Sequence, residues 1–544
     1  MGIHRNVCRS VFVWHAAILI GCAWVSPSRG TAQDPGQASA PSVIQNAAEP
    51  PLALAREQAA LGHYVQAVSA YTLALAGPHP PVLSDTDALF FATSLAATGD
   101  IDAARQQLNQ ALLRSPESAA LNNALGTLIA QSGQMDAALP FFQRAVAADP
   151  SLSTAQYHLG AALLALNQPD AALGPLRVAV QVTPDRFDVQ LQLGKALSAT
   201  HQDTEALTHL HLAAQLLAPS TSPDALYALA LALQASGDAR GSLPIFEAAT
   251  SAPNASAAAS GSAALTNYAL ARVQTGDAVD AIPLYKRALA LGPDTPDLRE
   301  DFGVAYLQQS DIDHALEQFR AGLAVDPSSA HLHYDLGLAL KLKDDLAGAV
   351  PEFEQAQRLD PTLPDPPYTL GVIYMQQGRF PDAIRQLKHA TELQPANGDA
   401  WALLGSILKD SDDPAGAFDA LTRAVALEPD QPSLHIQLAA LDMEAGKHAE
   451  AAEERKIAAT LSRAANNRQR ASFSLKSGRV LLDQNKLPDA ILQLNNAAQA
   501  DPALAEPHLL LADAYAREGQ PDKAAAERTL AASLTTSSSS KEPK

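Results

Sequence analysis

Residues 119–150 read AALNNALGTLIAQSGQMDAALPFFQRAVAADP and contain a pattern that returns along the chain. The stretch holds Gly126, Gly133, Ala138 and Phe142 in that order, and it ends at Pro150. Similar residues stand at the same offsets before later prolines. These prolines form two series with a spacing of 34 residues, Pro116, Pro150 and Pro184, and Pro293, Pro327, Pro361, Pro395 and Pro429. A repeated unit therefore organises the chain, in place of several different globular domains.

Each recurring residue has a physical role in a helical hairpin. Gly126 and Ala138 are small enough for two antiparallel helices to approach closely, and Phe142 packs between them. Gly133 ends the first helix because it tolerates a left-handed backbone. Pro150 ends the second helix because it lacks an N–H group and restricts the residue before it. The pattern predicts two short helices per unit and an all-α protein.

A 34-residue unit with this order of small and large positions resembles the tetratricopeptide repeat (TPR) family. The resemblance implies a right-handed superhelical solenoid of about fourteen helix-turn-helix repeats. It covers almost the whole chain after the N-terminal segment. The units start near residues 48, 85, 119, 153, 187, 223, 262, 296, 330, 364, 398, 432, 471 and 505.

Two places depart from the 34-residue spacing by five-residue insertions, at the Ala/Ser-rich segment 254–261 and at the polar segment 466–470. Each insertion is either a kink or loosened joint between sub-arrays or a longer surface loop, and the sequence leaves both readings open. We predict the following domains: a signal peptide at 1–32, a flexible linker at 33–47, repeats at 48–220, a divergent repeat and joint at 221–261, repeats at 262–465, C-terminal repeats with a polar cap at 466–532, and a disordered tail at 533–544.

The N-terminus has the features of an export signal. Arg5 and Arg9 precede the mostly apolar segment 11–25, which is too short for a comfortable membrane span. Small residues before and at Ala32 suit a cleavage site. The sequence therefore predicts an exported protein of the bacterial periplasm or cell envelope, or a secreted one.

A second reading of the same segment is lipidation. The residues Leu19 to Cys22 resemble the lipobox of bacterial lipoproteins, which would make Cys22 the lipid-bearing first residue. The chain has only two cysteines, Cys8 and Cys22, and both lie in this segment. Cleavage after Ala32 would leave a mature chain without disulfides, thiolate metal sites or cysteine nucleophiles.

Charge limits the classes of partner. The chain has 38 Lys and Arg residues against 58 Asp and Glu residues, a formal net charge of −20. Nucleic-acid-binding proteins carry an excess of basic residues, because these displace counterions from phosphates. We expect protein or peptide partners, no nucleic acid, and no membrane insertion once the signal is removed.

The motifs of common enzymes are not found. The sequence has no Walker P-loop, no dinucleotide-binding glycine loop after a strand, no zinc helix of the His-Glu-x-x-His type and no EF-hand loop. His331 and His333 are two residues apart, so on a helix they point in different directions. His333 also holds the position that Trp401 has in another unit, which favours a packing role. We expect no catalytic residues, no cofactor and no metal.

The family resemblance implies that the first helices of the repeats line a concave groove, which usually holds an extended peptide or a partner helix. Tyrosines at the fifth position of the unit would offer apolar area and a hydroxyl group. Aspartates at the second position, such as Asp365 and Asp399, would give an acidic edge. The alternative is that these tyrosines pack against neighbouring repeats. The candidate groove residues are Asn123, Tyr157, Lys195, Tyr227, Glu300, His331, Tyr334, Lys341 and Tyr368.

The predicted function is a non-enzymatic protein-binding TPR scaffold of the bacterial cell envelope that recognises partners in its concave groove. The alternative function is a regulatory or substrate-presenting subunit of an envelope secretion, pilus or polysaccharide/glycosyltransferase machine.

Overall fold

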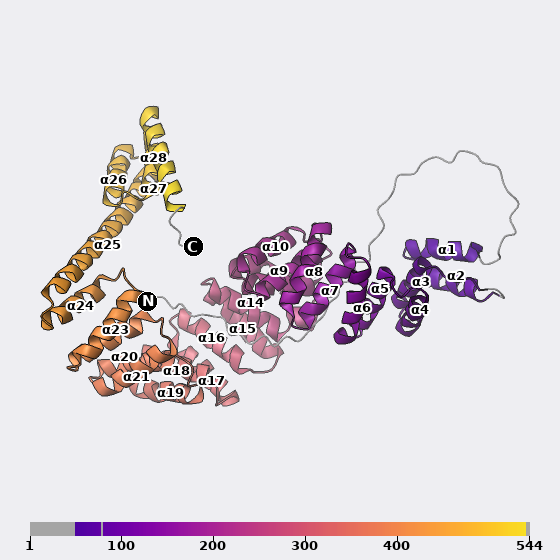
Figure 1. The fold of residues 1–544 in the computed structure, drawn as a ribbon, viewed down its shortest axis with the longest axis horizontal. Helices are drawn as coiled ribbons and strands as arrows, with labels where there is room; N and C mark the ends of the chain where they lie inside the picture. Colours follow the sequence, from indigo (N-terminus) through magenta and orange to yellow (C-terminus); the bar gives the residue numbers. More distant parts are fainter. Residues whose placement is uncertain (1–48, 78–79, 540–544) are drawn as a thin grey trace. The chain divides into compact units, whose positions relative to one another are not determined.

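The computed structural model describes residues 49–77 and 80–539, which consist of helices and the turns between them, without a strand (Figure 1). The described chain divides into two compact units, one up to Val325 and one from Asp326 onward. The predicted signal peptide, the linker at 33–47 and Cys22 lie outside the described residues.

The first unit is a series of consecutive helical hairpins. Its helices are α1 (Glu49–Ala60), α2 (Tyr64–Leu75), α3 (Asp85–Ala97), α4 (Ile101–Arg114), α5 (Ala119–Gln131), α6 (Met135–Ala148), α7 (Ser153–Ala165), α8 (Pro169–Val182), α9 (Phe187–Ala199), α10 (Asp203–Gln215), α11 (Pro223–Ala235), α12 (Ala239–Ser251), α13 (Ala257–Ser260), α14 (Ser262–Gln274), α15 (Ala278–Leu291), α16 (Pro296–Gln308) and α17 (Ile312–Val325).

The second unit continues the same pattern until one long helix interrupts it. Its helices are α18 (Ala330–Leu342), α19 (Leu346–Leu359), α20 (Asp365–Gln376), α21 (Phe380–Leu393), α22 (Gly398–Asp410), α23 (Pro414–Leu427), α24 (Pro432–Glu444), α25 (His448–Asp483), α26 (Leu487–Ala500), α27 (Ala505–Arg517) and α28 (Pro521–Ser539). In the described residues the first helices begin within a residue or so of the predicted unit starts, except that the start near 471 lies inside α25. The predicted all-α solenoid of hairpins is confirmed.

The close helix approach expected from the small residues is present in the core. A Cβ atom added to Gly126 on α5 would lie 2.8 Å from Cε1 of Phe142 on α6. Phe142 is fully buried, so its ring fills the space that the missing side chain leaves. Gly133, between the two helices, has φ +80°, and this left-handed conformation ends α5 as the sequence predicts.

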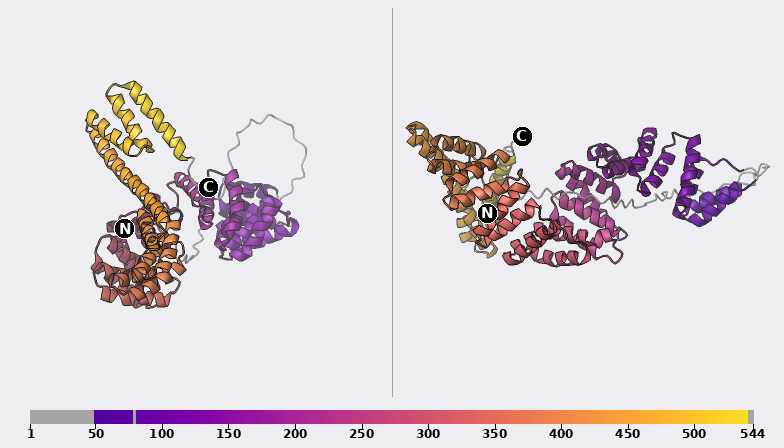
Figure 2. Two further views of the ribbon diagram at one scale, coloured as in Figure 1. Left: turned by 60° about the vertical axis from the view of Figure 1, so that its left-hand side comes forward. Right: turned by 90° about the horizontal axis from the view of Figure 1, so that it is seen from below.

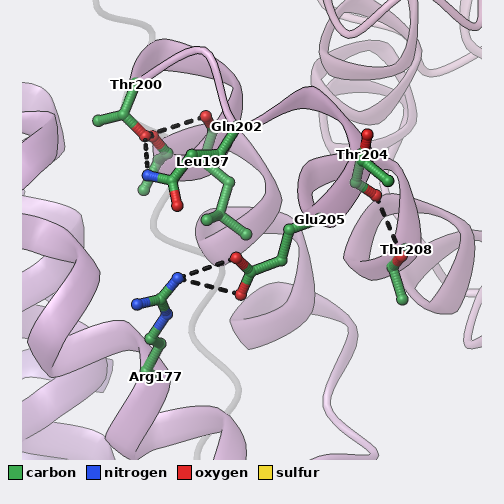
Figure 3. Close-up of polar contacts among 8 residues, drawn as sticks. Arg177, Leu197, Thr200, Gln202, Thr204, Glu205 and Thr208 are labelled. Carbon is green, nitrogen blue, oxygen red and sulfur yellow. Dashed lines mark hydrogen bonds and ion pairs between the residues drawn. The ribbon is translucent and has the colours of Figure 1, made fainter. Parts of the chain in front are cut away.

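In both compact units, the first helices of the repeats lie on one side of the array and the second helices lie on the other. The first helices of consecutive repeats contact one another, as α5, α7 and α9 do, and α20 and α22. We call the side formed by these helices the first-helix face. Second helices are also linked directly: on α8 and α10, Nη2 of Arg177 donates to both carboxylate oxygens of Glu205, at 3.1 and 2.9 Å (Figure 3).

The reading of 466–470 as a joint or a loop is wrong. These residues lie inside α25, which runs unbroken for 36 residues and joins the second helix of one repeat to the first helix of the next (Figure 2). The physical reason is the absence of helix breakers: α25 contains no proline, and its one glycine, Gly478, lies near the far end. Asn466 and Asn467 have only a modest helix penalty, which the surrounding alanines outweigh.

The other insertion, 254–261, forms an ordered segment. Ser256 accepts hydrogen bonds from the N–H groups of Ala258 and Ala259 at the start of α13, and its hydroxyl donates to Asp224 on α11. Ala259 is fully buried. The insertion therefore packs against α11, α12 and α14 as an added surface segment, which favours the loop reading over a loosened joint.

The C-terminal tail also differs from expectation. Disorder was predicted from residue 533, but α28 continues to Ser539, because residues 533–539 contain no proline or glycine that would end the helix. Residues 540–544 lie outside the described residues. The division after Val325 falls in a turn of ordinary length, so no insertion indicates it in the sequence. The predicted sub-array boundaries stay predictions.

Candidate functional site

In six repeats of the described chain, the first helix is fixed in place by the side chain at its fourth position. Its nitrogen donates a hydrogen bond to the carbonyl oxygen of the proline six residues earlier, which ends the preceding repeat. The donor-to-oxygen distances are 2.8 Å for Asn122, 2.8 Å for Gln156, 2.7 Å for Gln190, 3.1 Å for His333, 2.9 Å for Trp401 and 2.9 Å for His435. The packing role predicted from the equivalence of His333 and Trp401 is confirmed.

Fourth-position side chains of five repeats contact a residue 19 positions later, on the second helix of the same repeat. The distances are 2.7 Å for Gln190 with His209, 2.5 Å for Arg299 with Gln318, 2.6 Å for His333 with Glu352, 2.5 Å for His435 with Glu454 and 2.6 Å for His508 with Glu527. In the repeat of Asn122 the later position holds Phe141, and the buried Oδ1 of Asn122 has no hydrogen-bond partner in the described structure. This pairing was not predicted, although the spacing of 19 residues recurs visibly in the sequence.

In three pairs of adjacent repeats, a fifth-position side chain contacts the next repeat along the first-helix face. Oδ1 of Asn123 on α5 lies 2.8 Å from Nδ1 of His158 on α7. The hydroxyl of Tyr227 on α11 accepts a hydrogen bond of 2.8 Å from Nδ2 of Asn267 on α14. In the second unit the hydroxyl of Tyr334 lies 3.4 Å from Oγ1 of Thr369. The partner is in each case the sixth-position residue of the following repeat, and we call these three equivalent contacts the ladder.

The tyrosine rings are more deeply placed than an open groove requires. Tyr157 is 8% exposed, and the guanidinium of Arg186 lies 5.5 Å from its ring centre. Burial raises the pKa of Tyr157, and the nearby carboxylate of Asp188 raises it further. Tyr368 is half-buried, and its pKa is raised by burial and then by Asp399 and Glu428. The geometry of Tyr157, Tyr227 and Tyr334 thus matches the packing alternative, while half-buried rings still contribute apolar surface.

The charged candidates lie on first helices as predicted, and they differ in exposure. Lys195 on α9 is half-buried, and burial lowers the pKa of its amine. Glu300 on α16 and Lys341 on α18 are also half-buried, whereas His331 on α18 is exposed. The structure places Asn123, Tyr157, Lys195, Tyr227 and Glu300 in the first unit, and His331, Tyr334, Lys341 and Tyr368 in the second.

The acidic edge is only partly available. Asp188 pairs with Arg186, and Asp224 accepts the hydroxyl of Ser256. Asp297, Asp365 and Asp399 are exposed. An incoming cationic side chain would therefore meet carboxylates on α20 and α22 of the second unit, where two consecutive repeats present them.

His158 is a half-buried histidine on the first-helix face. Its ring lies against Phe142 and Tyr157, with centroid distances of 5.5 and 5.3 Å. Burial lowers the pKa of His158 to about 4, with the nearby Arg186 acting in the same direction. The ring is therefore neutral at pH 7, and it joins the ladder as a hydrogen-bonding group without charge.

Residues 49–77 and 80–539 contain no group of three or more His, Cys, Asp or Glu side chains placed to hold a metal ion. Across the same described ranges, no helix has both the length and the apolar composition needed to cross a bilayer.

Comparison with known proteins identifies the repeat. Models described as tetratricopeptide repeat match residues 89–153, 227–296, 301–364 and 340–407, and one described as TPR repeat matches 478–519. No curated protein matches the chain.

Two of the solved structures that this chain is similar to differ in how much of the chain they match. One is MamA, residue 41 to the end, from Desulfovibrio magneticus RS-1, with 22% identity, 31% of this chain and 97% of that chain covered, and a TM-score of 0.29. Another is the APC/C hetero-tetramer Cut9-Hcn1, with 15% identity and a TM-score of 0.32. The match covers 86% of this chain and 96% of that chain. From the family matches and the repeated hairpins with their recurring contacts, the chain belongs to the tetratricopeptide repeat family.

Proposed function

We propose that this chain is a non-enzymatic scaffold that binds a protein or peptide partner along its first-helix face. The observation that carries the proposal is the ladder of fifth- to sixth-position contacts, within a family whose repeats serve as protein-interaction modules. Because the ladder orders these side chains before a partner arrives, little conformational entropy remains to be lost on binding.

The chemistry of the face suggests the kind of partner. Half-buried rings such as Tyr334 and Tyr368 provide flat apolar area at low entropic cost, and the exposed Asp365 and Asp399 stand beside them in consecutive repeats. A segment with apolar side chains and one or two basic residues would satisfy both features.

The test begins with crosslinking in cells and identification of the partner by mass spectrometry. Affinity is then measured for the double variants Y334A/Y368A and D365N/D399N. Lys388→Ala is the control, because Lys388 is exposed on the second helix α21 of the same unit. We expect each double variant to weaken binding at least tenfold, or about 1.4 kcal/mol, with the control unchanged.

Circular dichroism must show that the variants keep their helices. Unchanged affinity in both folded double variants would exclude the first-helix face. Recovery of a single stoichiometric enzyme in the crosslinking step would instead support the role of a regulatory or substrate-presenting subunit.

We also propose that the protein is exported. The support is the basic, then apolar, then small-residue order of residues 1–32. Mass spectrometry of the mature N-terminus distinguishes cleavage after Ala32 from lipidation of Cys22. A mature chain that still begins at Met1 would contradict export.

A further inference from the structure

Charge is distributed very unevenly along α25. Between residues 455 and 482 the chain has no Asp or Glu, although acids outnumber bases in the whole protein by 58 to 38. The basic residues of this segment are Arg455, Lys456, Arg463, Arg468, Arg470, Lys476 and Arg479. Salt screens charges beyond about 8–10 Å, so a partner near this helix meets the local positive charge before the negative charge of the rest.

The central cations of this helix are available for binding. Lys456 forms an ion pair with Glu453, and Arg479 with Glu506. Arg463, Arg468 and Arg470 are exposed, and no ion pair involves them in the described part of the chain. In the repeats the helices are normally flanked by neighbours along their length, but the centre of α25 lies between the two hairpins that it joins.

Several exposed residues of α25 lie along one continuous stripe of the helix surface. The buried residues Ala451 and Ala458 face α24, and the buried Ala471 and Gly478 face α26, on a different side of the helix. The side left uncovered by both hairpins is what we call the α25 stripe, with the members Arg455, Ala459, Arg463, Asn466, Arg470, Phe473 and Val480. These residues recur at intervals of three, four or seven, which is the spacing of one helix face.

The stripe combines charge with apolar anchors. Phe473 is 75% exposed and Val480 is 49% exposed, although both are residues that burial would stabilise. Arg463 and Arg470 are two helical turns apart, about 10.5 Å along the axis. Ala459 and Asn466 between the cations are small or compact, so a second helix could approach closely there.

We propose that the α25 stripe is a docking surface for an acidic amphipathic helix of a partner protein. The carboxylates of such a helix, two turns apart, would pair with Arg463 and Arg470, and its apolar residues would cover Phe473 and Val480. This helix-on-helix contact uses charge for orientation and the apolar end for affinity. A lipid surface fits less well, because an interfacial helix needs a long apolar face and the N-terminal half of the stripe has none.

The probe for the test is a synthetic helical peptide of 21 residues, with Leu at intervals of three and four and Glu on both flanks, labelled for fluorescence anisotropy. A peptide with Lys in place of Glu is its control. The protein is the full chain, either unchanged or carrying R463E/R470E or F473A. R287E/R320E is the matched control variant, because Arg287 and Arg320 are exposed on α15 and α17 and the change in net charge is the same.

We expect the acidic peptide to bind the unchanged chain and the control peptide with Lys not to bind it. R463E/R470E should weaken binding at least about tenfold, and F473A by a factor of about three to ten. R287E/R320E should bind as the unchanged chain does. The first-helix face variants Y334A/Y368A should also bind normally, which separates this proposal from the proposed function.

Three outcomes would overturn the proposal. The first is no binding of the acidic peptide. The second is an equal loss of affinity for the acidic peptide in R463E/R470E and R287E/R320E, which would mean general electrostatic attraction without a specific binding site. The third is binding to vesicles of phosphatidylglycerol, lost in R463E/R470E, without binding to the peptide, which would assign the stripe to a membrane surface.

Discussion

At the scale of single residues, the fold depends on a few tight contacts that sequence position alone indicates. Gly126 and Phe142 were predicted to meet, and they do, because only a residue without a side chain leaves room for the ring. The ladder along the first-helix face was not predictable in this way. It requires the distance and orientation between consecutive repeats, which the spacing of 34 residues implies only roughly. The sequence predicted which residues occupy the fifth position of each unit, but not that Asn123, Tyr227 and Tyr334 contact the following repeat.

Gly126→Ala should destabilise the protein, because its new Cβ would lie 2.8 Å from Cε1 of the buried Phe142. We expect a loss of about 1–3 kcal/mol in the free energy of unfolding. Gly174→Ala is the matched control: Gly174 is within α8 and has no atom within 4 Å of the added Cβ, so a gain of about 0.5–1 kcal/mol is expected. Urea unfolding followed by circular dichroism measures both. Equal effects of the two changes would show that packing at Gly126 is unimportant.

The half-buried His158 should make stability depend on pH. Histidine in an unfolded chain titrates near 6.5, and burial lowers the pKa of His158 to about 4 in the fold. The unfolded chain therefore binds the proton more readily, so the contribution of the neutral ring is complete above pH 6.5 and is lost as pH falls toward 4. The loss amounts to about 3 kcal/mol. Urea unfolding at pH 7.5, 5.5 and 4.2 should show this slope, and His158→Gln should reduce it; identical slopes would contradict the assignment.

At the scale of helices, many boundaries lie where the sequence has helix-breaking glycine or proline. The boundaries that were predicted wrongly lie where the sequence has no such residue. Helices end at Gly133 and before Pro150 as predicted, because a left-handed residue and a missing N–H group act locally. The segment 466–470 has polar residues but no breaker, and polarity by itself does not end a helix. The fourth-position contacts were missed for another reason: Gln190, His333 and Trp401 share a role through one donor nitrogen, although their side chains look unrelated in the sequence.

The contacts of His435 allow this shared role to be tested. Nε2 of His435 lies 2.9 Å from the carbonyl oxygen of Pro429, and Nδ1 lies 2.5 Å from Glu454. His435→Ala removes both contacts and should cost about 1–3 kcal/mol of unfolding free energy. His435→Gln should cost less, since Gln190 reaches the equivalent proline carbonyl. Thermal and urea unfolding compare the two variants, and equal losses would refute the role of the donor.

At the scale of the whole molecule, the 34-residue repeat predicted an array of helical hairpins. The local sequence could not predict that this array divides into two compact units. Each helix contacts mainly its near neighbours in the chain, so stability is close to a sum over adjacent repeats. The boundary after Val325 arises from contacts between hairpins and has no signature in residue type. Because this boundary has no signature in residue type, residues of the first-helix face could be assigned to one of the two compact units only from the structure.

Separate expression of residues 49–325 and 326–539 should yield two folded proteins. Each contains complete hairpins with their own buried cores, and repeat arrays remain folded when shortened at a repeat boundary. Circular dichroism should show helical spectra and cooperative thermal transitions for both. An unfolded fragment would mean that the two units depend on each other for stability.

The continuity of α25 also restricts how this protein can vary in evolution. In an ordinary turn, a residue gained or lost changes the local loop and leaves the helices in place. Within the segment 459–470, one deleted residue would turn the later helices by about 100° about the axis of α25 and draw them in by about 1.5 Å. Most side chains there are exposed and can be exchanged, whereas their number sets the direction of α26, α27 and α28. Selection should therefore preserve the length of this segment more strictly than its composition.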